Sequence, residues 1–284
     1  MSFPEVDLKE KAKEIRYHTC DAIATHGAGH LGGCMSCVEL ITVLYYKVLN
    51  VDPKNPQMEG RDRVVMSKGH AGPTLYATLA LKGFFPMDWL KTLNAPNTNL
   101  PSHCDMNRTP GIDMTTGSLG QGASTAMGIA CGNRLKGYEN YTYLILGDGE
   151  IEEGQVWEAA MFAGAKQLSH VIAFVDYNKC QIDDYVENLC ALGDVSKKFE
   201  QFGWYAQNEE DGNNVDQIED AIRKAKSQHE KPSVIILNTK KGKGYSKIEG
   251  KLSCHNMPVT QDMVIEACRE LDEELRKLKI QEGQ

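Results

Sequence analysis

The chain has 284 residues, of which 41% are hydrophobic and 25% are charged, and these proportions are those of an ordinary globular protein. Its formal net charge of -8 argues against the basic surface that binding to nucleic-acid phosphates requires. No apolar run approaches the roughly 20 residues that span a bilayer, and the first residues contain no apolar signal core. We therefore expect a cytoplasmic protein that binds neither nucleic acid nor membrane.

Helical and strand-like segments alternate along the first half of the chain. Residues 7–26 have the periodicity of an amphipathic helix that ends at glycines, and a second helix is predicted over 36–49. A short strand is predicted over 63–67, with a helix after it over 74–84. Residues 86–114 lack periodicity, and so long an irregular stretch is typical of a functional loop.

The second half of the chain continues this alternation. Segment 115–137 is rich in Gly, Ala and Ser, so its helix can approach another backbone or a ligand closely. Strands are predicted at 141–146, 171–176, 203–207 and 233–239, and helices at 154–168 and 216–230. The alternation predicts an α/β fold, with a parallel central sheet and helices on both faces.

One domain with a C-terminal extension is the simplest division of the chain, because no repeat or low-complexity linker interrupts it. We predict a ligand-binding domain over residues 1–258 and a helical extension over 259–284. The helix predicted near 260–279 is highly charged, which favours a place outside the core.

Nine cysteines are scattered along the chain without the spacing of a disulfide framework, which fits reduced thiols in the cytosol. Cys34 and Cys37 form the only Cys-x-x-Cys pair. Without a second pair or a nearby His-x-x-x-His, they lack the four ligands of a structural zinc site. We interpret them as packed thiols at the start of a helix, with a redox or metal role as the less favoured alternative.

An acidic segment, LGDGEIEEGQ, runs from Leu146 to Gln155 directly after a predicted buried strand. A carboxylate at the carboxyl end of a central strand lies where open α/β sheets bind ligands. The glycines beside Asp148 let the backbone approach a bulky anion, and the helix that follows offers unpaired N–H groups. Taken alone, Gly-Asp-Gly is common and more often forms a simple tight turn. We expect Glu150 and Glu152 to be solvent-exposed.

The next strand favours a metal site over a simple turn. It ends just before Asn178, and parallel strands bring their carboxyl ends to the same edge of a sheet. Asp148 and Asn178 can therefore offer two hard oxygen ligands to one cation, with a main-chain carbonyl just beyond Asn178 as a third. Magnesium or calcium, completed by phosphate oxygens, suits such a set. The sequence thus predicts a cation that bridges a protein carboxylate to a bound diphosphate.

Several motifs together resemble those of the transketolase family. Gly-Asp-Gly followed by Asn178 within strand-helix-strand resembles the thiamine diphosphate motif. The other matching segments are GHLGG around His30, SKGHAG around His70, LPSHCD around His103, TTGSLGQG from Thr115, GDGEIEEGQVWEA from Gly147, DYNKCQID from Asp176 and KGKGYSKIEGKLSCH up to His255. They occur in the family order, and the resemblance implies the thiamine diphosphate-binding fold.

The resemblance implies thiamine diphosphate as the cofactor, with one divalent cation beside it. Asp148, Asn178 and the main chain of Cys180 would hold Mg²⁺ or Ca²⁺. Gly149 and Asn178 would also contact the diphosphate. The segment Gly117-Ser118-Leu119 is similar to the one that approaches the aminopyrimidine end of the cofactor.

Four histidines resemble those that line the family's active site. His70 corresponds to a histidine that contacts the cofactor, and His255 to one that reaches both diphosphate and substrate. His30, His103 and His255 correspond to substrate-facing histidines. The reaction must protonate a developing alkoxide and later remove a hydroxyl proton, and imidazoles suit both transfers. We interpret the remaining histidines as surface or hydrogen-bonding residues: His18, His26, His170 and His229.

Two glutamates resemble residues at a subunit interface of the family, near the carboxylate that activates the aminopyrimidine. For Glu153 the resemblance implies positioning or proton relay, and for Glu158 a place close to the cofactor. A charge that stabilises the helix start is the alternative for Glu153. The chain departs from the family at Leu31 and Ser118, where proline is frequent, which bears on the substrate more than on the cofactor.

A transketolase of ordinary size carries two further domains, of which the first supplies the glutamate that activates the aminopyrimidine. The resemblance covers only the diphosphate-binding domain. We therefore expect the N-terminal subunit of a split transketolase, completed by a chain with the pyrimidine-binding and C-terminal domains, in two copies of each. The complex would transfer a two-carbon ketol unit from a ketose to an aldose. Sugar phosphates are the default substrates, with sulfosugars and branched sugar phosphates as alternatives.

Three other functions share part of this pattern. The α subunit of a 2-oxo acid dehydrogenase has the Gly-Asp-Gly and the Asn, but not TTGSLGQG with the four histidines. A deoxyxylulose-phosphate synthase shares more motifs but is normally one long chain. A catalytically silent regulatory subunit would have no chemical need for Asp148, Asn178 and the histidines.

Overall fold

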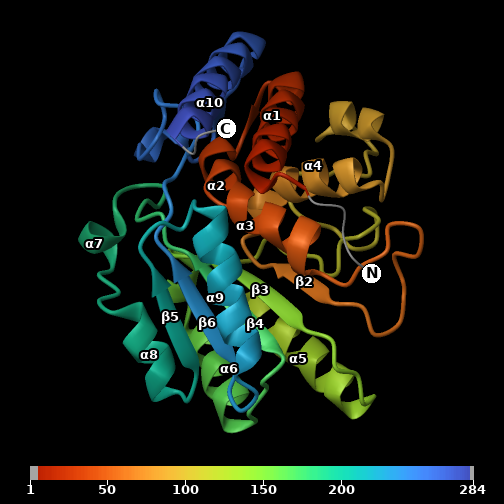
Figure 1. The fold of residues 1–284 in the computed structure, drawn as a ribbon, viewed down its shortest axis with the longest axis vertical. Helices are drawn as coiled ribbons and strands as arrows, with labels where there is room; N and C mark the ends of the chain where they lie inside the picture. The colour runs from red at the N-terminus through yellow and green to blue at the C-terminus, as the bar shows by residue number, and fades with distance from the viewer. Residues whose placement is uncertain (1–5, 282–284) are drawn as a thin grey trace.

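A parallel sheet forms the centre of the protein, for which the computed structural model describes residues 6–281. Its five strands lie in the order β2-β3-β4-β6-β5, and every neighbouring pair is parallel (Figure 1). The strands are β2 (Arg63–Met66), β3 (Thr142–Gly147), β4 (Val171–Asp176), β5 (Tyr205–Glu209) and β6 (Ser233–Leu237). The predicted parallel α/β fold is confirmed.

Helices cover both faces of the sheet. Side chains alternate between the faces along each strand, so Ile145 joins one core while Leu144 and Leu146 join the other. The first core is closed by α1 (Leu8–His26), α2 (Leu31–Met35), α3 (Val38–Val43), α4 (Gly72–Lys82) and α9 (Val215–Ser227). The second is closed by α5 (Gln121–Leu135), α6 (Gly154–Ala165) and α8 (Val195–Gln201).

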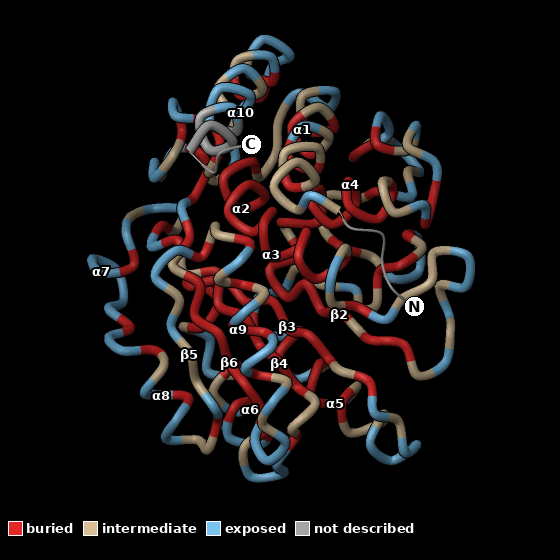
Figure 2. The backbone as a smooth tube through the Cα atoms, viewed as in Figure 1, coloured by how far each residue is buried: buried red, intermediate tan, exposed pale blue. Residues whose placement is uncertain are grey.

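Burial on both faces explains why the central strands are continuously apolar. All residues of β3 and β4 are buried, and the red core of Figure 2 runs along them. The edge strand β5 is partly exposed and begins two residues later than predicted. Gly203 turns the chain with a φ of 85°, and Trp204 then enters the second core and donates to the carbonyl of Ala160 at 2.8 Å.

Several short elements lie near the strand ends. The helix predicted over 36–49 is broken at Ser36 and Cys37, and after α3 it continues as a π-turn over Leu44–Val48. A two-residue strand, β1 (Ala28–Gly29), pairs antiparallel with β7 (Met257–Pro258). The remaining short helices are η2 (Gly69–Ala71), η3 (Met87–Thr92), η4 (Glu150–Glu152), α7 (Val186–Leu189) and η5 (Leu252–Cys254). The β1–β7 pair brings the chain around His30 beside the chain around His255.

The C-terminal helix α10 (Gln261–Gln281) packs along α1, as Figure 1 shows. Val264 and Ala267 are buried and belong to the first core, so the expectation that this helix lies outside the core is wrong for the face that packs on α1. The division of the chain at residue 258 stays a prediction, and its outer limits, residues 1–5 and 282–284, lie outside the described residues. Among the residues that the structure describes, no helix combines the length and apolarity needed to cross a membrane.

Cys34 and Cys37 are buried and unpaired, and burial raises the pKa of each thiol to about 12. Their sulfurs lie 3.5–3.6 Å from main-chain carbonyl oxygens. Thiols with so high a pKa are poor nucleophiles and poor metal ligands, which agrees with the interpretation of packed thiols.

Replacing Gly164 with Ala should lower the free energy of unfolding by about 2 kcal/mol or more, because overpacking forces the backbone to move. A Cβ at this position would lie 1.7 Å from the carbonyl oxygen of Phe202. Gly128→Ala in α5 is the matched control, since nothing lies within 4 Å of the added carbon. Denaturant unfolding of the two variants checks this: equal stabilities would contradict the close approach of α6 to Phe202.

Candidate active site

Four histidine rings meet at the carboxyl edge of the sheet. His30 precedes α2, His70 lies in η2, His103 lies in the long loop before α5, and His255 follows η5. The ring centroid of His30 lies 5.4 Å from His70, 5.5 Å from His103 and 5.4 Å from His255. His70 and His255 are 5.3 Å apart. The structure therefore brings all four predicted histidines into one cluster.

Partial burial keeps these imidazoles neutral. Desolvation lowers the pKa of all four, and it lowers that of His255 to about 4. The pKa of His70 lies well below its usual value, because burial is joined by the positive charge of Lys68 and by the neighbouring imidazoles. Near neutral pH each ring can thus accept a proton at one nitrogen and donate one from the other.

A cavity of about 200 Å³ adjoins the cluster. The predicted site residues that line it are His70, Leu119, Asp148, Gly149, Asn178, Cys180 and His255. It lies at the ends of β3 and β4, as expected for a ligand site in an open α/β sheet. Residues from the histidine motifs and residues from the acidic segment were predicted independently, and the structure shows that members of both groups line the same cavity.

Asp148 is 3% exposed and sits at the cavity wall. It accepts hydrogen bonds from the main-chain N–H groups of Gly149, at 2.9 Å, and Lys179. Burial and the nearby charge of Asp176 raise the pKa of its carboxyl to about 7. None of the ion pairs found among the described residues involves Asp148, so a divalent cation would compensate this buried charge.

The other predicted metal ligands follow at the end of β4. The amide oxygen of Asn178 accepts from the N–H of Cys180 at 3.1 Å, and the carbonyl of Cys180 accepts from Lys241 Nζ at 3.1 Å. The described residues contain no cluster of three His, Cys, Asp or Glu side chains suited to a metal. A set of one carboxylate, one amide and one carbonyl needs no such cluster, and its hard oxygens fit Mg²⁺ or Ca²⁺ when phosphate oxygens complete it.

The segment before α5 approaches the cluster closely. Gly117 has a φ of 144°, and a Cβ there would lie 3.2 Å from the His103 ring. Leu119 lines the cavity, whereas Ser118 is exposed. Glu153 and Glu158 are also exposed, at the start of α6 and away from the cavity lining. Within this chain the structure does not bring these two glutamates to the histidines.

Two buried ions that the sequence analysis missed organise the site. Asp176 is completely buried and accepts hydrogen bonds from Ser36 Oγ at 2.6 Å and from Lys68 Nζ, with which it forms an ion pair. Burial alone would raise the pKa of Asp176, but the Lys68 charge and these hydrogen bonds lower it overall. The sequence feature that could have identified Asp176 is a carboxylate at the end of a fully apolar strand, because a buried carboxylate needs a charged or hydrogen-bonding partner.

Lys241 is a further missed residue. Its side chain is 1% exposed, lines the cavity, and donates to the carbonyl of Gln181 at 2.8 Å in addition to that of Cys180. Burial lowers the pKa of its ammonium group. A cation in this position can bind the oxygens of a diphosphate. Lys241 begins the motif that ends at His255, but the sequence analysis assigned it no role.

The expectation that Glu150 is solvent-exposed is wrong. Its side chain is 2% exposed, because the η4 turn directs it back under the end of the sheet. Glu152 is half-buried, and its carboxylate accepts from the side chain of Gln181.

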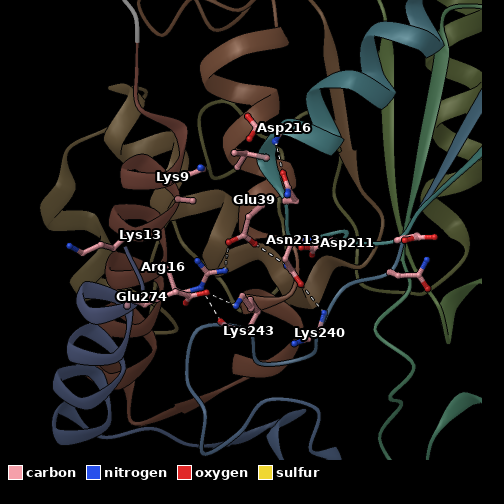
Figure 3. Close-up of a pocket in the computed structure, with 16 residues that line it drawn as sticks. Lys9, Lys13, Arg16, Glu39, Asp211, Asn213, Asp216, Lys240, Lys243 and Glu274 are labelled. Carbon is pink, nitrogen blue, oxygen red and sulfur yellow. Dashed lines mark hydrogen bonds and ion pairs between the residues drawn. The ribbon is translucent and has the colours of Figure 1, made fainter. Parts of the chain in front are cut away.

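A larger cavity of about 610 Å³ lies elsewhere, between α1, α10 and the loop before α9 (Figure 3). Four of its charged side chains form ion pairs: Arg16 with Glu39 at 2.7 Å, and Lys243 with Glu274 at 3.1 Å. None of the predicted site residues lines it. Size alone therefore does not identify the candidate active site.

Comparison with known proteins assigns this chain to one family. Residues 8–282 match the family described as transketolase, thiamine diphosphate binding domain. The protein is thus a thiamine diphosphate-binding domain of the α/β type. The chain belongs to the transketolase family, as the motifs predicted, and corresponds to its N-terminal part.

Two relatives of similar length are named as subunits. The chain is 52% identical to the 6-deoxy-6-sulfo-D-fructose transketolase subunit SqwG of Clostridium sp. (strain MSTE9), across 96% of this chain and 99% of that protein. It is 36% identical to an apulose-4-phosphate transketolase subunit from Actinobacillus succinogenes, across 96% and 98%. Transketolase from Leishmania mexicana has a similar structure, with a TM-score of 0.90 and 29% identity, and the chain covers 42% of it.

Replacing His255 with Asn should reduce the pH dependence of stability in acid. With a pKa lowered from 6.5 to about 4, His255 binds a proton in the unfolded chain at a pH where the folded chain does not. Its contribution to stability is therefore complete above pH 6.5 and is lost as the pH falls toward 4.

The measurement is the free energy of unfolding of wild type and variant between these pH values. The wild type should lose stability more steeply, by up to about 1.4 kcal/mol per pH unit, which is the slope produced by one extra proton on the unfolded chain. His229→Asn, on the exposed loop after α9, is the control variant. Parallel curves for wild type and His255→Asn would show that burial does not shift the His255 pKa.

Proposed function

We propose that this chain is the thiamine diphosphate-binding subunit of a two-subunit transketolase. The complex transfers a two-carbon ketol unit from a ketose to an aldose. The observation that carries the proposal is the cluster of His30, His70, His103 and His255 beside the cavity that Asp148 and Asn178 line. The family match favours this reaction over that of a 2-oxo acid dehydrogenase.

The residues at the strand ends fit the diphosphate half of the cofactor. Asp148, Asn178 and the carbonyl of Cys180 would hold Mg²⁺ or Ca²⁺, and Lys241 would contribute a positive charge to the diphosphate. Gly149 has no side chain to fill the cavity. A Cβ at this position would lie 3.2 Å from the side chain of Gln181, so a larger residue would crowd the space. When bound, thiamine diphosphate supplies the electron sink for the transferred unit.

The histidines would handle the protons of the reaction. His30, His103 and His255 face the substrate in this proposal, while His70 contacts the cofactor. Because their pKa values are lowered, the neutral rings can accept the proton of a sugar hydroxyl as the carbon–carbon bond breaks. The same ring can return the proton to the oxygen that becomes an alcohol.

A partner chain would complete the site. Two relatives that this chain covers almost entirely are named as transketolase subunits, which supports a separate chain with the pyrimidine-binding and C-terminal domains. The exposed Met161 and Phe162 on α6 support self-association, because apolar side chains at 54% and 42% exposure favour a protein contact. Glu153 and Glu158, on the same helix, would then lie at that interface, in a complex with two copies of each chain.

The names of the relatives suggest which donor sugar to test first. The 52% identity to a subunit named for 6-deoxy-6-sulfo-D-fructose makes a sulfosugar the first donor to test, with ketose phosphates second. The unpaired cysteines are in keeping with a cytoplasmic location.

Reconstitution tests the function. The chain alone should show little ketol transfer, and adding the co-purified partner chain should restore it with 6-deoxy-6-sulfo-D-fructose or xylulose 5-phosphate as donor. In the complex, His103→Ala should lower kcat about 100-fold or more, because positioned proton transfer contributes that much. Full activity of the chain alone would sink the two-subunit proposal, and unchanged turnover of His103→Ala would indicate a silent subunit.

Asp148→Ala should abolish metal-dependent binding of thiamine diphosphate by the assembled complex. Without the carboxylate, the cation loses its only charged protein ligand. Calorimetric titration with and without Mg²⁺ measures this, and Asp88→Asn on the exposed η3 turn is the control. Binding that still depends on Mg²⁺ in Asp148→Ala would contradict the metal assignment.

A further inference from the structure

Glu150 joins three segments that meet at the candidate active site. Its Oε1 atom accepts from the hydroxyl of Ser67 and from the N–H of Gly120 at 2.9 Å, and its Oε2 atom accepts from the N–H of Gly147 at 3.0 Å. Ser67 follows β2, Gly120 begins α5, and Gly147 ends β3. One buried carboxylate therefore links two strand ends and a helix start.

Both main-chain contacts adjoin the cavity wall: Gly147 itself lines the cavity, as does Glu150, and Gly120 lies next to a lining residue. Gly120 directly follows Leu119, and Gly147 directly precedes Asp148, both of which line the cavity. In the proposed cofactor site, Leu119 lies on the aminopyrimidine side and Asp148 lies on the metal side. Glu150 is hydrogen-bonded to the residue directly after Leu119 and to the residue directly before Asp148, and it thereby links the two sides.

The segment around Leu119 needs such an anchor, because its backbone is irregular. Gly117 and Gly120 both have positive φ angles, 144° and 83°. The first N–H groups of α5 have no partner within the helix, and Gly120 offers one of them to Glu150. At Gly122 a Cβ would lie 2.3 Å from Ser67 Oγ, so the start of α5 presses against the end of β2.

A carboxylate satisfies these donors together, because Ser67 and the N–H of Gly120 contact one oxygen and the N–H of Gly147 contacts the other. It accepts at both oxygens, whereas an amide of the same shape has one accepting oxygen and one NH₂ group. Glutamine would direct the NH₂ group either at the N–H of Gly147 or at Ser67 and the N–H of Gly120. A buried donor that faces another donor loses its hydrogen bond, and affinity that depends on this contact falls with it.

We propose that Glu150 is a positioning residue for cofactor binding, whose carboxylate holds Leu119 and Asp148 at a set separation on the cavity wall. The inference rests on the proposed function, because it concerns the same site. Glu150 acts through Gly120 and Gly147 and does not itself take part in the chemistry. A wall that is already ordered spares thiamine diphosphate the entropic cost of ordering it.

The test compares wild type and Glu150→Gln in the complex with its partner chain. The dissociation constant for thiamine diphosphate, measured at saturating Mg²⁺, should rise about tenfold or more. With saturating cofactor, the KM for the donor sugar should stay within about twofold, because the histidines keep their places. This split separates positioning of the cofactor from a general loss of structure.

Two further variants make the test sharper. Ser67→Ala removes one donor and leaves both main-chain donors, so its dissociation constant should rise less than that of Glu150→Gln. Should Glu150→Gln fail to fold, unchanged cofactor affinity in Ser67→Ala would itself overturn the proposal. Glu139→Gln, which changes an exposed carboxylate on the loop before β3, should bind like wild type.

The outcomes distinguish this inference from the proposed function. Wild type that binds no thiamine diphosphate would overturn the proposed function and the inference with it. Wild type that binds tightly, with an equal affinity in Glu150→Gln, would overturn the inference alone. If the KM for sugar rises by the same factor as the dissociation constant for the cofactor, Glu150 has a general structural role, and this result would also overturn the inference.

Discussion

The buried ion pair of Asp176 and Lys68 is the interaction on which the site depends. Asp176 lies at the end of β4 and Lys68 just after β2, so the pair spans the strand β3 that lies between them. Thr239, after β6, also donates to Asp176, and Lys68 donates to the carbonyl of Gly33 at 2.9 Å. Removing one partner from such a buried pair costs about 3–5 kcal/mol, because the other charge is left uncompensated.

Burial sets the chemistry of the groups around this pair. Desolvation raises the pKa of Asp148 and lowers that of the histidines, so a carboxylate and four imidazoles are all held away from their charged forms. Such a site favours a ligand that carries both a cation and an anion, since each compensates a different buried group. A metal-bound diphosphate has this composition, which is why the fold and the proposed cofactor suit each other.

The sequence predicted the strands of the sheet well, because β3 and β4 are apolar on both faces and parallel sheets require that pattern. It placed the start of β5 two residues too early. An edge strand is half-exposed and shows no clear apolar pattern, and the sequence did not reveal that Trp204 packs into the second core just before the strand. It also located Asp148, Asn178 and the histidines through their motifs. It assigned Glu150 to solvent, because a run of acidic residues after a turn has the same composition whether or not one of them is buried.

The sequence by itself therefore determined the parallel α/β architecture, the family and the residues that we propose carry the chemistry. These features depend on local patterns: apolar runs, glycine turns and short motifs. Only the tertiary structure decided which ions lie in the interior. Asp176 meets Lys68, and Glu150 meets Ser67 and Gly120, across long distances in the chain. Burial of a charge depends on donors from several strands at once, and no single segment of sequence contains that information.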